Sequence, residues 1–120
     1  MKKEKNPLVE AIVQGMQDKK GKNIVVVDLT EIPDTICGYF VIATGGSPSQ
    51  IQALARSVGD KALELAHQKP LAVDGLQYSQ WVAMDYGTVI VHLFLREMRE
   101  FYDLERLWAD AIITEIPNLD

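Results

Sequence analysis

Apolar residues recur along the chain with two periods, one typical of helices and the other of strands. Leu8, Ile12 and Met16 are four residues apart, as on the buried side of a helix. Asn6 precedes them as a capping residue and Gly21 follows them as a helix stop. The pattern therefore predicts a first helix between these two positions.

A second, longer helix is predicted from Ser47 to about His67. Ser47 is a good N-cap, Pro48 suits the first helical position, and Gln50 stands where it can complete a capping box. The buried side of this helix would consist of six apolar residues at helical spacing: Ile51, Leu54, Ala55, Val58, Ala62 and Leu65.

Short runs rich in β-branched and aromatic residues predict five strands. They are residues 24–29, 39–44, 71–73, 81–86 and 89–94. The first run is apolar almost throughout, which predicts a strand in the interior of a sheet. The last two flank Gly87 and predict a hairpin.

A last amphipathic helix is predicted to end before Pro117, with Phe101, Leu104, Glu105, Leu107 and Trp108 at helical spacings. The resulting order of helices and strands predicts an α/β fold, with a mixed sheet of about five strands flanked by helices. The chain has 120 residues and shows no internal repeat or linker, so residues 1–120 are expected to form a single domain.

Charge is unevenly distributed along the chain. The formal net charge is −5; residues 1–69 carry 9 basic and 8 acidic side chains, whereas residues 70–120 carry 3 and 9. An acidic surface repels phosphate and attracts a basic protein, so direct DNA binding is not expected. The alternative is an acidic face that only aids solubility.

Cys37 is the single cysteine of the sequence, so no internal disulfide can form. No apolar run approaches the ~18 residues of a membrane span, and no signal peptide is recognisable. These features predict a cytoplasmic protein with no membrane association. Beside Gly38, Cys37 is interpreted as a small apolar filler and not as a nucleophile.

The turn Gly45-Gly46-Ser47 joins a predicted strand to a predicted helix, where backbone amides can hold an anion. Such a turn also opens the active site of nucleotidyltransferases, which need a pair of carboxylates for magnesium. Asp74 and Asp85 are the strand carboxylates after this turn, and each stands alone. Capping geometry is therefore favoured, no metal or cofactor is expected, and a nucleotidyltransferase-like enzyme remains the alternative.

Neither histidine has a partner at metal-ligand spacing. His92 lies between Val91 and Leu93 in a predicted strand, which favours a packed, hydrogen-bonded side chain over a catalytic base. No nucleophile, base and acid can be combined from the sequence, so no catalytic residue is predicted.

Aromatic, acidic and arginine residues crowd one segment of the chain, and such residues often anchor protein interfaces. They are Trp81, Asp85, Tyr86, His92, Phe94, Glu97, Arg99, Phe101, Tyr102, Glu105 and Trp108. Phe94, Phe101 and Trp108 are expected to be core, whereas Trp81, Asp85 and Tyr86 could form a surface patch. Strand alternation places Trp81 and Asp85 on the face opposite Met84 and Tyr86.

At these residues the sequence resembles the ribosomal silencing factor family, RsfS, also called Iojap. The matching residues are Tyr39 to Gly45 with Ser47 and Gln50; Trp81 to Gly87 with Val89, Val91, His92 and Phe94; and Glu97, Arg99, Phe101, Tyr102, Leu104, Glu105, Leu107, Trp108, Asp110 and Ala111. Two positions depart from the pattern, because Gly38 and Thr88 stand where the family usually has Asp.

The resemblance implies a nucleotidyltransferase-like fold without catalysis. It also implies binding to the large ribosomal subunit on its basic protein fourteen, which blocks joining of the small subunit and represses translation under nutrient limitation. By the same resemblance, Trp81, Met84, Asp85 and Tyr86 are the expected partner-binding residues. Self-association into a homodimer through the same aromatic surface is an open alternative.

Overall fold

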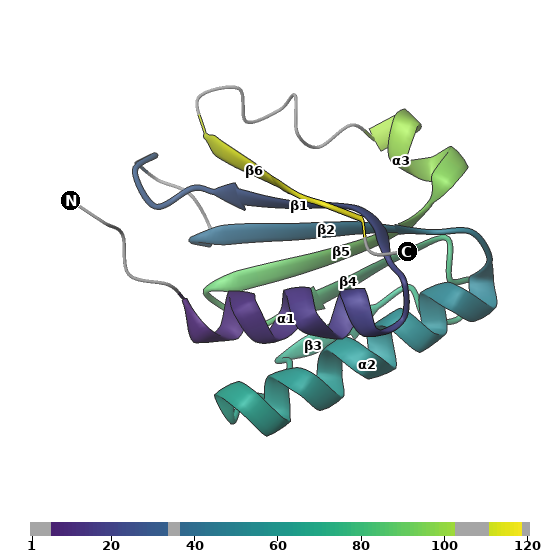
Figure 1. Cartoon of the computed structure of the whole chain (residues 1–120), viewed down its shortest axis with the longest axis horizontal. Coiled ribbons are helices and arrows are strands. Elements are labelled where there is room, and N and C mark those ends of the chain that lie inside the picture. Colours follow the sequence, from purple (N-terminus) through teal and green to yellow (C-terminus); the bar gives the residue numbers. More distant parts are fainter. Residues whose placement is uncertain (1–5, 34–36, 103–110, 119–120) are drawn as a thin grey trace.

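The computed structural model describes residues 6–33, 37–102 and 111–118 (Figure 1). Three helices and six strands follow one another in these ranges: α1 (Pro7–Asp18), β1 (Lys22–Asp28), β2 (Tyr39–Gly45), α2 (Pro48–Ala66), β3 (Ala72–Asp74), β4 (Trp81–Asp85), β5 (Val89–Leu95), α3 (Arg96–Tyr102) and β6 (Ile112–Ile116).

The first two helices begin where their capping residues predict. The Asn6 side chain accepts hydrogen bonds from the backbone N–H groups of Leu8 and Val9, at 3.0 and 3.2 Å. Ser47 Oγ accepts one from Gln50 N at 3.1 Å. These bonds satisfy amides that have no partner within the helix. α2 ends at His67, which adopts a left-handed conformation with φ of 56°.

The strands form one mixed sheet in the order β3-β4-β5-β2-β1-β6. β2 and β5 run parallel, and the other described pairs are antiparallel. β1 lies between β2 and β6, which confirms the predicted interior position. The α/β class with a mixed sheet is also confirmed.

The C-terminal part of the sheet differs from the sequence prediction. The sheet has six strands and not about five, because residues 112–116 form β6 and pair antiparallel with β1. This segment is rich in β-branched residues, which favour an extended backbone. The helix in this region, α3, spans Arg96–Tyr102 and includes Phe101. The predicted helical residues Leu104, Glu105, Leu107 and Trp108 lie outside the described residues.

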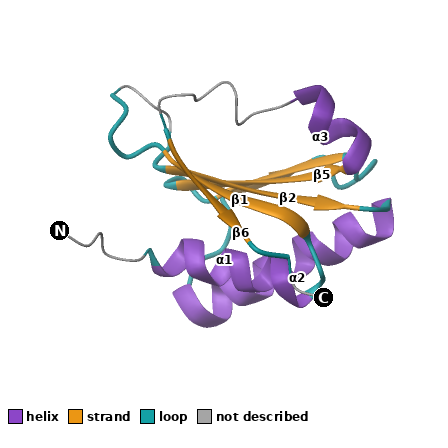
Figure 2. Ribbon diagram, turned by 45° about the horizontal axis from the view of Figure 1, so that its top comes forward, coloured by secondary structure: helices purple, strands orange, loops and turns teal. Residues whose placement is uncertain are grey.

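The helices lie on both faces of the sheet, with α1 and α2 on one side and α3 on the other (Figure 2). α1 and α2 approach closely at Gly15, whose carbonyl accepts a hydrogen bond from Ser57 Oγ at 2.7 Å. A Cβ at Gly15 would lie 2.8 Å from Val58 Cα, so only glycine allows this contact. The main apolar core is therefore formed between these two helices and the sheet. Among the described residues, no helix is both long and apolar enough to cross a membrane.

Candidate partner-binding surface

The two faces of β4 have different environments. Met84 and Tyr86 are only 3% and 6% exposed and belong to the core between the sheet and the helices α1 and α2. Trp81 and Asp85 lie half-buried on the opposite face. The alternation predicted from the sequence is therefore confirmed, and only two of the four expected partner-binding residues share an accessible face.

Tyr86 lies in the interior. Its hydroxyl group is buried without a hydrogen-bond partner, and this burial raises the pKa of the phenol to about 12. The side chain therefore stays neutral at physiological pH. Met84 and Tyr86 support β4 from beneath and do not present a contact surface of their own.

Four aromatic rings meet on the opposite face of the sheet and are called the aromatic cluster here: Phe40, Trp81, His92 and Phe94. The Trp81 and Phe94 rings stack with centroids 5.2 Å apart, and His92 contacts Phe40 edge to face at 5.0 Å. The sheet register explains this grouping, because Trp81 pairs with Phe94 directly and His92 lies diagonally across from it. The stacking on Phe94 holds the indole ring of Trp81 against this face of the sheet.

His92 is the polar member of the aromatic cluster. Trp81 Nε1–H donates a hydrogen bond to His92 Nδ1 at 3.0 Å, which requires an unprotonated Nδ1. Burial lowers the pKa of His92 to about 4, in agreement with a neutral ring whose proton is on Nε2. His92 Nε2 is itself buried without a hydrogen-bond partner. The predicted packed, hydrogen-bonded strand histidine is confirmed.

Burial of neutral His92 gives the protein a pH-dependent stability. The folded-state pKa of about 4 lies below the ordinary value of 6.5, so the unfolded chain binds a proton first as pH falls. The free energy of unfolding is expected to decrease between pH 6.5 and about 4, by up to about 1.4 kcal/mol per pH unit from this group. Urea unfolding at pH 7 and 4.5 measures the effect. His92→Phe should lose this part of the pH dependence, and equal curves for both proteins would contradict the assignment.

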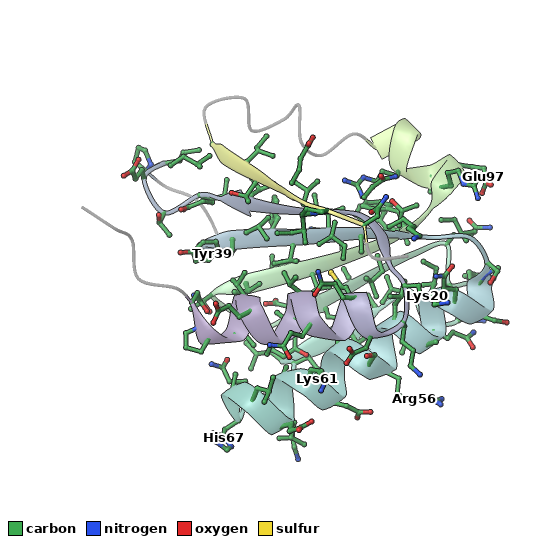
Figure 3. All side chains as sticks on the ribbon, in the orientation of Figure 1. Lys20, Tyr39, Arg56, Lys61, His67 and Glu97 are labelled. Carbon is green, nitrogen blue, oxygen red and sulfur yellow. The ribbon has the colours of Figure 1, made fainter. Side chains whose placement is uncertain are left out.

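Asp85 ends β4 and closes the hairpin. Its Oδ1 accepts a hydrogen bond from Gly87 N at 2.7 Å. Asp74 on β3 pairs with Ala83, so its side chain is on the same face of the sheet as Asp85. Arg56, Lys61 and His67 lie instead on the outer side of α2, away from the sheet (Figure 3). The face that carries Trp81 is therefore acidic at this edge.

Gly38 and Thr88, the two departures from the family pattern, are neighbours in the structure. Gly38 N donates to the Thr88 carbonyl at 2.8 Å, and Tyr39 N donates to the same oxygen at 3.2 Å. A Cβ at Gly38 would lie 3.3 Å from that oxygen, which is a tight contact. These two positions, where the family usually has Asp, therefore lie side by side at the start of β2 and β5. Neither residue carries a charge in this protein.

The Gly45-Gly46-Ser47 turn is bound to Gln50 in the first turn of α2. Gly46 N donates to Gln50 Oε1 at 2.7 Å, and Gln50 N donates to Ser47 Oγ. In the predicted capping box the Gln50 side chain would accept a hydrogen bond from Ser47 N. In the structure it accepts one from Gly46 N instead, so only the bond from Gln50 N to Ser47 Oγ follows the predicted pattern. Gln50 Nε2 also donates to the carbonyls of Lys19 and Lys20, both at 3.2 Å. These bonds tie the loop after α1 to the start of α2 and favour a structural role for the turn over anion binding.

The metal-ligating side chains and the single cysteine were the remaining candidates for chemistry in the described ranges 6–33, 37–102 and 111–118. These ranges contain no group of three or more His, Cys, Asp or Glu side chains that could hold a metal ion. Cys37 is buried, its thiol donates to the Tyr39 carbonyl at 3.5 Å, and burial raises its pKa. A thiol with a raised pKa is a poor nucleophile, which agrees with the predicted filler role.

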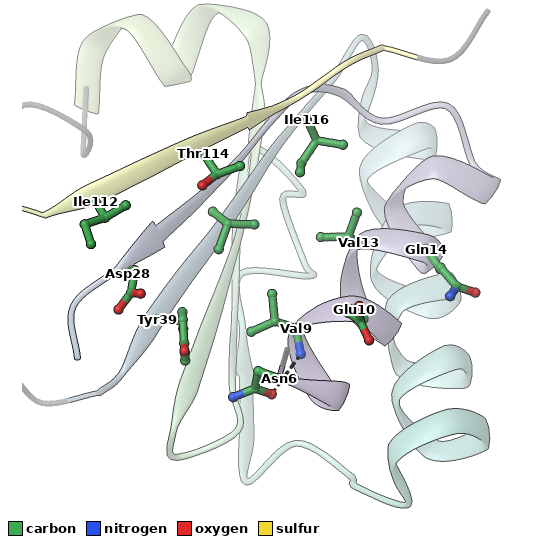
Figure 4. Close-up of a pocket in the computed structure, with 11 residues that line it drawn as sticks. Asn6, Val9, Glu10, Val13, Gln14, Asp28, Tyr39, Ile112, Thr114 and Ile116 are labelled. Carbon is green, nitrogen blue, oxygen red and sulfur yellow. Dashed lines mark hydrogen bonds between the residues drawn. The ribbon is translucent and has the colours of Figure 1, made fainter. Parts of the chain in front are cut away.

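A groove that the sequence did not predict lies between α1 and the β6 edge of the sheet (Figure 4). Its volume is about 620 Å³, and the residues that line it are Asn6, Val9, Glu10, Val13, Gln14, Val26, Asp28, Tyr39, Ile112, Thr114 and Ile116. Three of them belong to β6, so the groove could not be found before that strand was known. Ile112 is 48% exposed at its edge.

Comparisons with known proteins identify relatives in sequence and in fold. Residues 2–120 match the family model described as ribosomal silencing factor during starvation. The ribosomal silencing factor RsfS of Bacillus subtilis is 36% identical over 99 residues, which cover 82% of each chain. That of Halalkalibacterium halodurans is 33% identical over 112 residues, covering 93% of this chain and 94% of the relative.

A solved structure is similar to this protein in fold as well as in sequence. The crystal structure of a Chromobacterium violaceum protein superposes with a TM-score of 0.78 at 33% sequence identity, covering 85% of this chain and 83% of the other. Sequence and fold therefore agree over most of the chain, and the protein belongs to the ribosomal silencing factor family.

Proposed function

We propose that this protein binds the large ribosomal subunit through its protein fourteen and blocks joining of the small subunit. Translation would then fall when nutrients are limiting. The proposal requires a cytoplasmic protein, because the ribosomes it silences are there. It requires no catalysis, only sufficient affinity and the right position.

The observation that carries the proposal is the face of β4 with Trp81 and Asp85. The exposed part of a half-buried indole can pack against a partner surface, and a nearby carboxylate can pair with a basic residue. Asp74 on β3 adds a second carboxylate to this face. Residues 70–120 as a whole carry three times as many acidic as basic side chains, which suits a basic partner. Met84 and Tyr86 contribute by holding β4 in place from the core.

Steric exclusion fits a molecule of this size. The described fold measures 40 × 32 × 30 Å, so wherever it is bound it has the bulk to keep two surfaces apart. A compact body fixed at the subunit interface would prevent contact over a wider area than it covers. Family membership supports a ribosomal role in general, and the partner protein and mechanism are parts of this proposal.

Sedimentation with separated ribosomal subunits tests the proposal. The protein is expected to migrate with the large subunit and not with the small one, and to reduce the peak of joined ribosomes when small subunits are added. The sedimentation coefficient of the protein alone, measured separately, reports whether a homodimer forms. Protein that stays at the top of the gradient, with unchanged subunit joining, would contradict the proposal.

A further inference from the structure

We propose that His92 is a positioning residue that holds the Trp81 indole in the orientation recognised by the large ribosomal subunit. The inference rests on the proposed function above. His92 is only 7% exposed and its Nε2 is fully buried, so it cannot itself contact a partner. Any effect of His92 on binding must therefore act through a neighbour.

The geometry identifies Trp81 as that neighbour. Its Nε1–H donates to His92 Nδ1 at 3.0 Å, and its ring stacks on Phe94 with a centroid distance of 5.2 Å. The hydrogen bond fixes the polar edge of the indole, and the stacking fixes its plane. A side chain held in its bound orientation loses less conformational freedom when a partner binds.

The placement of His92 explains why its single acceptor matters. Phe40, Phe94 and Trp81 surround the imidazole, with ring centroids 5.0, 6.0 and 5.8 Å away. Within this aromatic cluster, His92 Nδ1 accepts the hydrogen bond of the Trp81 indole N–H. The buried, unpartnered Nε2–H on the other side costs stability. Packing alone does not require a histidine at this position, and what its Nδ1 adds is the acceptor that orients Trp81.

Two substitutions separate the acceptor from the packing. His92→Phe keeps a ring of similar shape and removes the acceptor. His92→Asn loses the ring but keeps an oxygen close to the position of Nδ1. His92→Phe is expected to bind large subunits about three- to ten-fold more weakly, although it keeps the core filled. His92→Asn should bind more tightly than His92→Phe, although it loses more packing; a purely structural role predicts the opposite order.

The Trp81 indole N–H resonance in a ¹H–¹⁵N spectrum reports the hydrogen bond directly, and Trp81→Phe assigns it. His92→Phe should shift this resonance and speed its exchange with water, whereas His92→Asn should restore it in part. In a Trp81→Phe background, His92→Phe should have no further effect on binding. An equal loss in both backgrounds, or unchanged binding by His92→Phe, would overturn the inference.

Failure of the proposed function would look different. If the wild-type protein did not bind large subunits, the proposed function would be wrong, and the positioning of Trp81 would be judged from its resonance alone. An indole resonance unaffected by His92→Phe would then overturn the inference. A normal resonance shift together with unchanged binding would show that Trp81 orientation is irrelevant to the partner, which also overturns it.

Discussion

Asp85→Lys is expected to weaken binding to isolated large ribosomal subunits by about a hundred-fold, because a like-charge contact in an interface costs several kcal/mol. Asp85 lies on the same face of β4 as Trp81, at the end of the hairpin, where a partner can reach it. A lysine at this position would place a positive charge against the basic surface of the proposed partner. Titration of labelled protein with large subunits at fixed salt measures the change.

Two control variants distinguish a direct contact of Asp85 from an effect on folding and from an effect of the net charge. Asp85→Asn keeps the oxygen that accepts from Gly87 N at 2.7 Å and removes only the charge, so it should lose less affinity than Asp85→Lys. Asp60→Lys makes the same change in net charge on the exposed side of α2, in the opposite layer, and should bind almost normally. Wild-type affinity for Asp85→Lys, or an equal loss for Asp60→Lys, would show that Asp85 does not make the contact.

Local sequence signals predicted the elements whose stability is set locally. Asn6 and Ser47 marked the starts of α1 and α2, because a capping side chain bonds to amides two or three residues away. Hairpin β4–β5 was predicted from alternation and Gly87, which are equally local. β6 was missed because the helical spacing of the preceding residues was extended to just before Pro117, although the β-branched residues of Ile112–Ile116 favour a strand. Its pairing with β1 joins residues more than eighty positions apart, and no local pattern encodes such a pairing.

The surface could be predicted only in part for a related reason. Alternation separated Trp81 and Asp85 from Met84 and Tyr86, but the sequence did not reveal which face α1 and α2 cover. That depends on how the connection through α2 crosses the sheet from β2 to the parallel strand β5. The hydrogen bond from Trp81 to His92 likewise depends on the register of β4 and β5, which brings residues eleven positions apart together.

Gly75 lies in the turn that connects β3 to Trp81, the first residue of β4. Its φ is +95°, a conformation that other residues rarely adopt, and a Cβ there would lie 2.1 Å from the Trp81 carbonyl oxygen. Two hydrogen bonds from Ser79 stabilise the turn. Its backbone N–H donates to the Gly75 carbonyl at 2.9 Å, and its Oγ donates to the Leu76 carbonyl at 2.7 Å. Because the atom in the way belongs to the backbone, no side-chain rotation can relieve the clash.

Gly75→Ala is therefore expected to lower the free energy of unfolding by about 4 kcal/mol, from the combined cost of backbone strain and overpacking. The midpoint of thermal unfolding should fall by on the order of 15 °C, which circular dichroism measures directly. Any folded fraction should also bind large subunits weakly, since the carbonyl that must move belongs to Trp81.

Gly59→Ala is the matched control for this substitution. Gly59 lies within α2, and a Cβ there would meet only the end of the Met84 side chain at 3.9 Å, an ordinary contact. Alanine favours a helix over glycine by up to about 1 kcal/mol, so this variant should be as stable as the wild type or slightly more so. If Gly75→Ala melted within about 2 °C of Gly59→Ala, a difference of well under 1 kcal/mol, the turn would tolerate a side chain and would not fix Trp81 as argued.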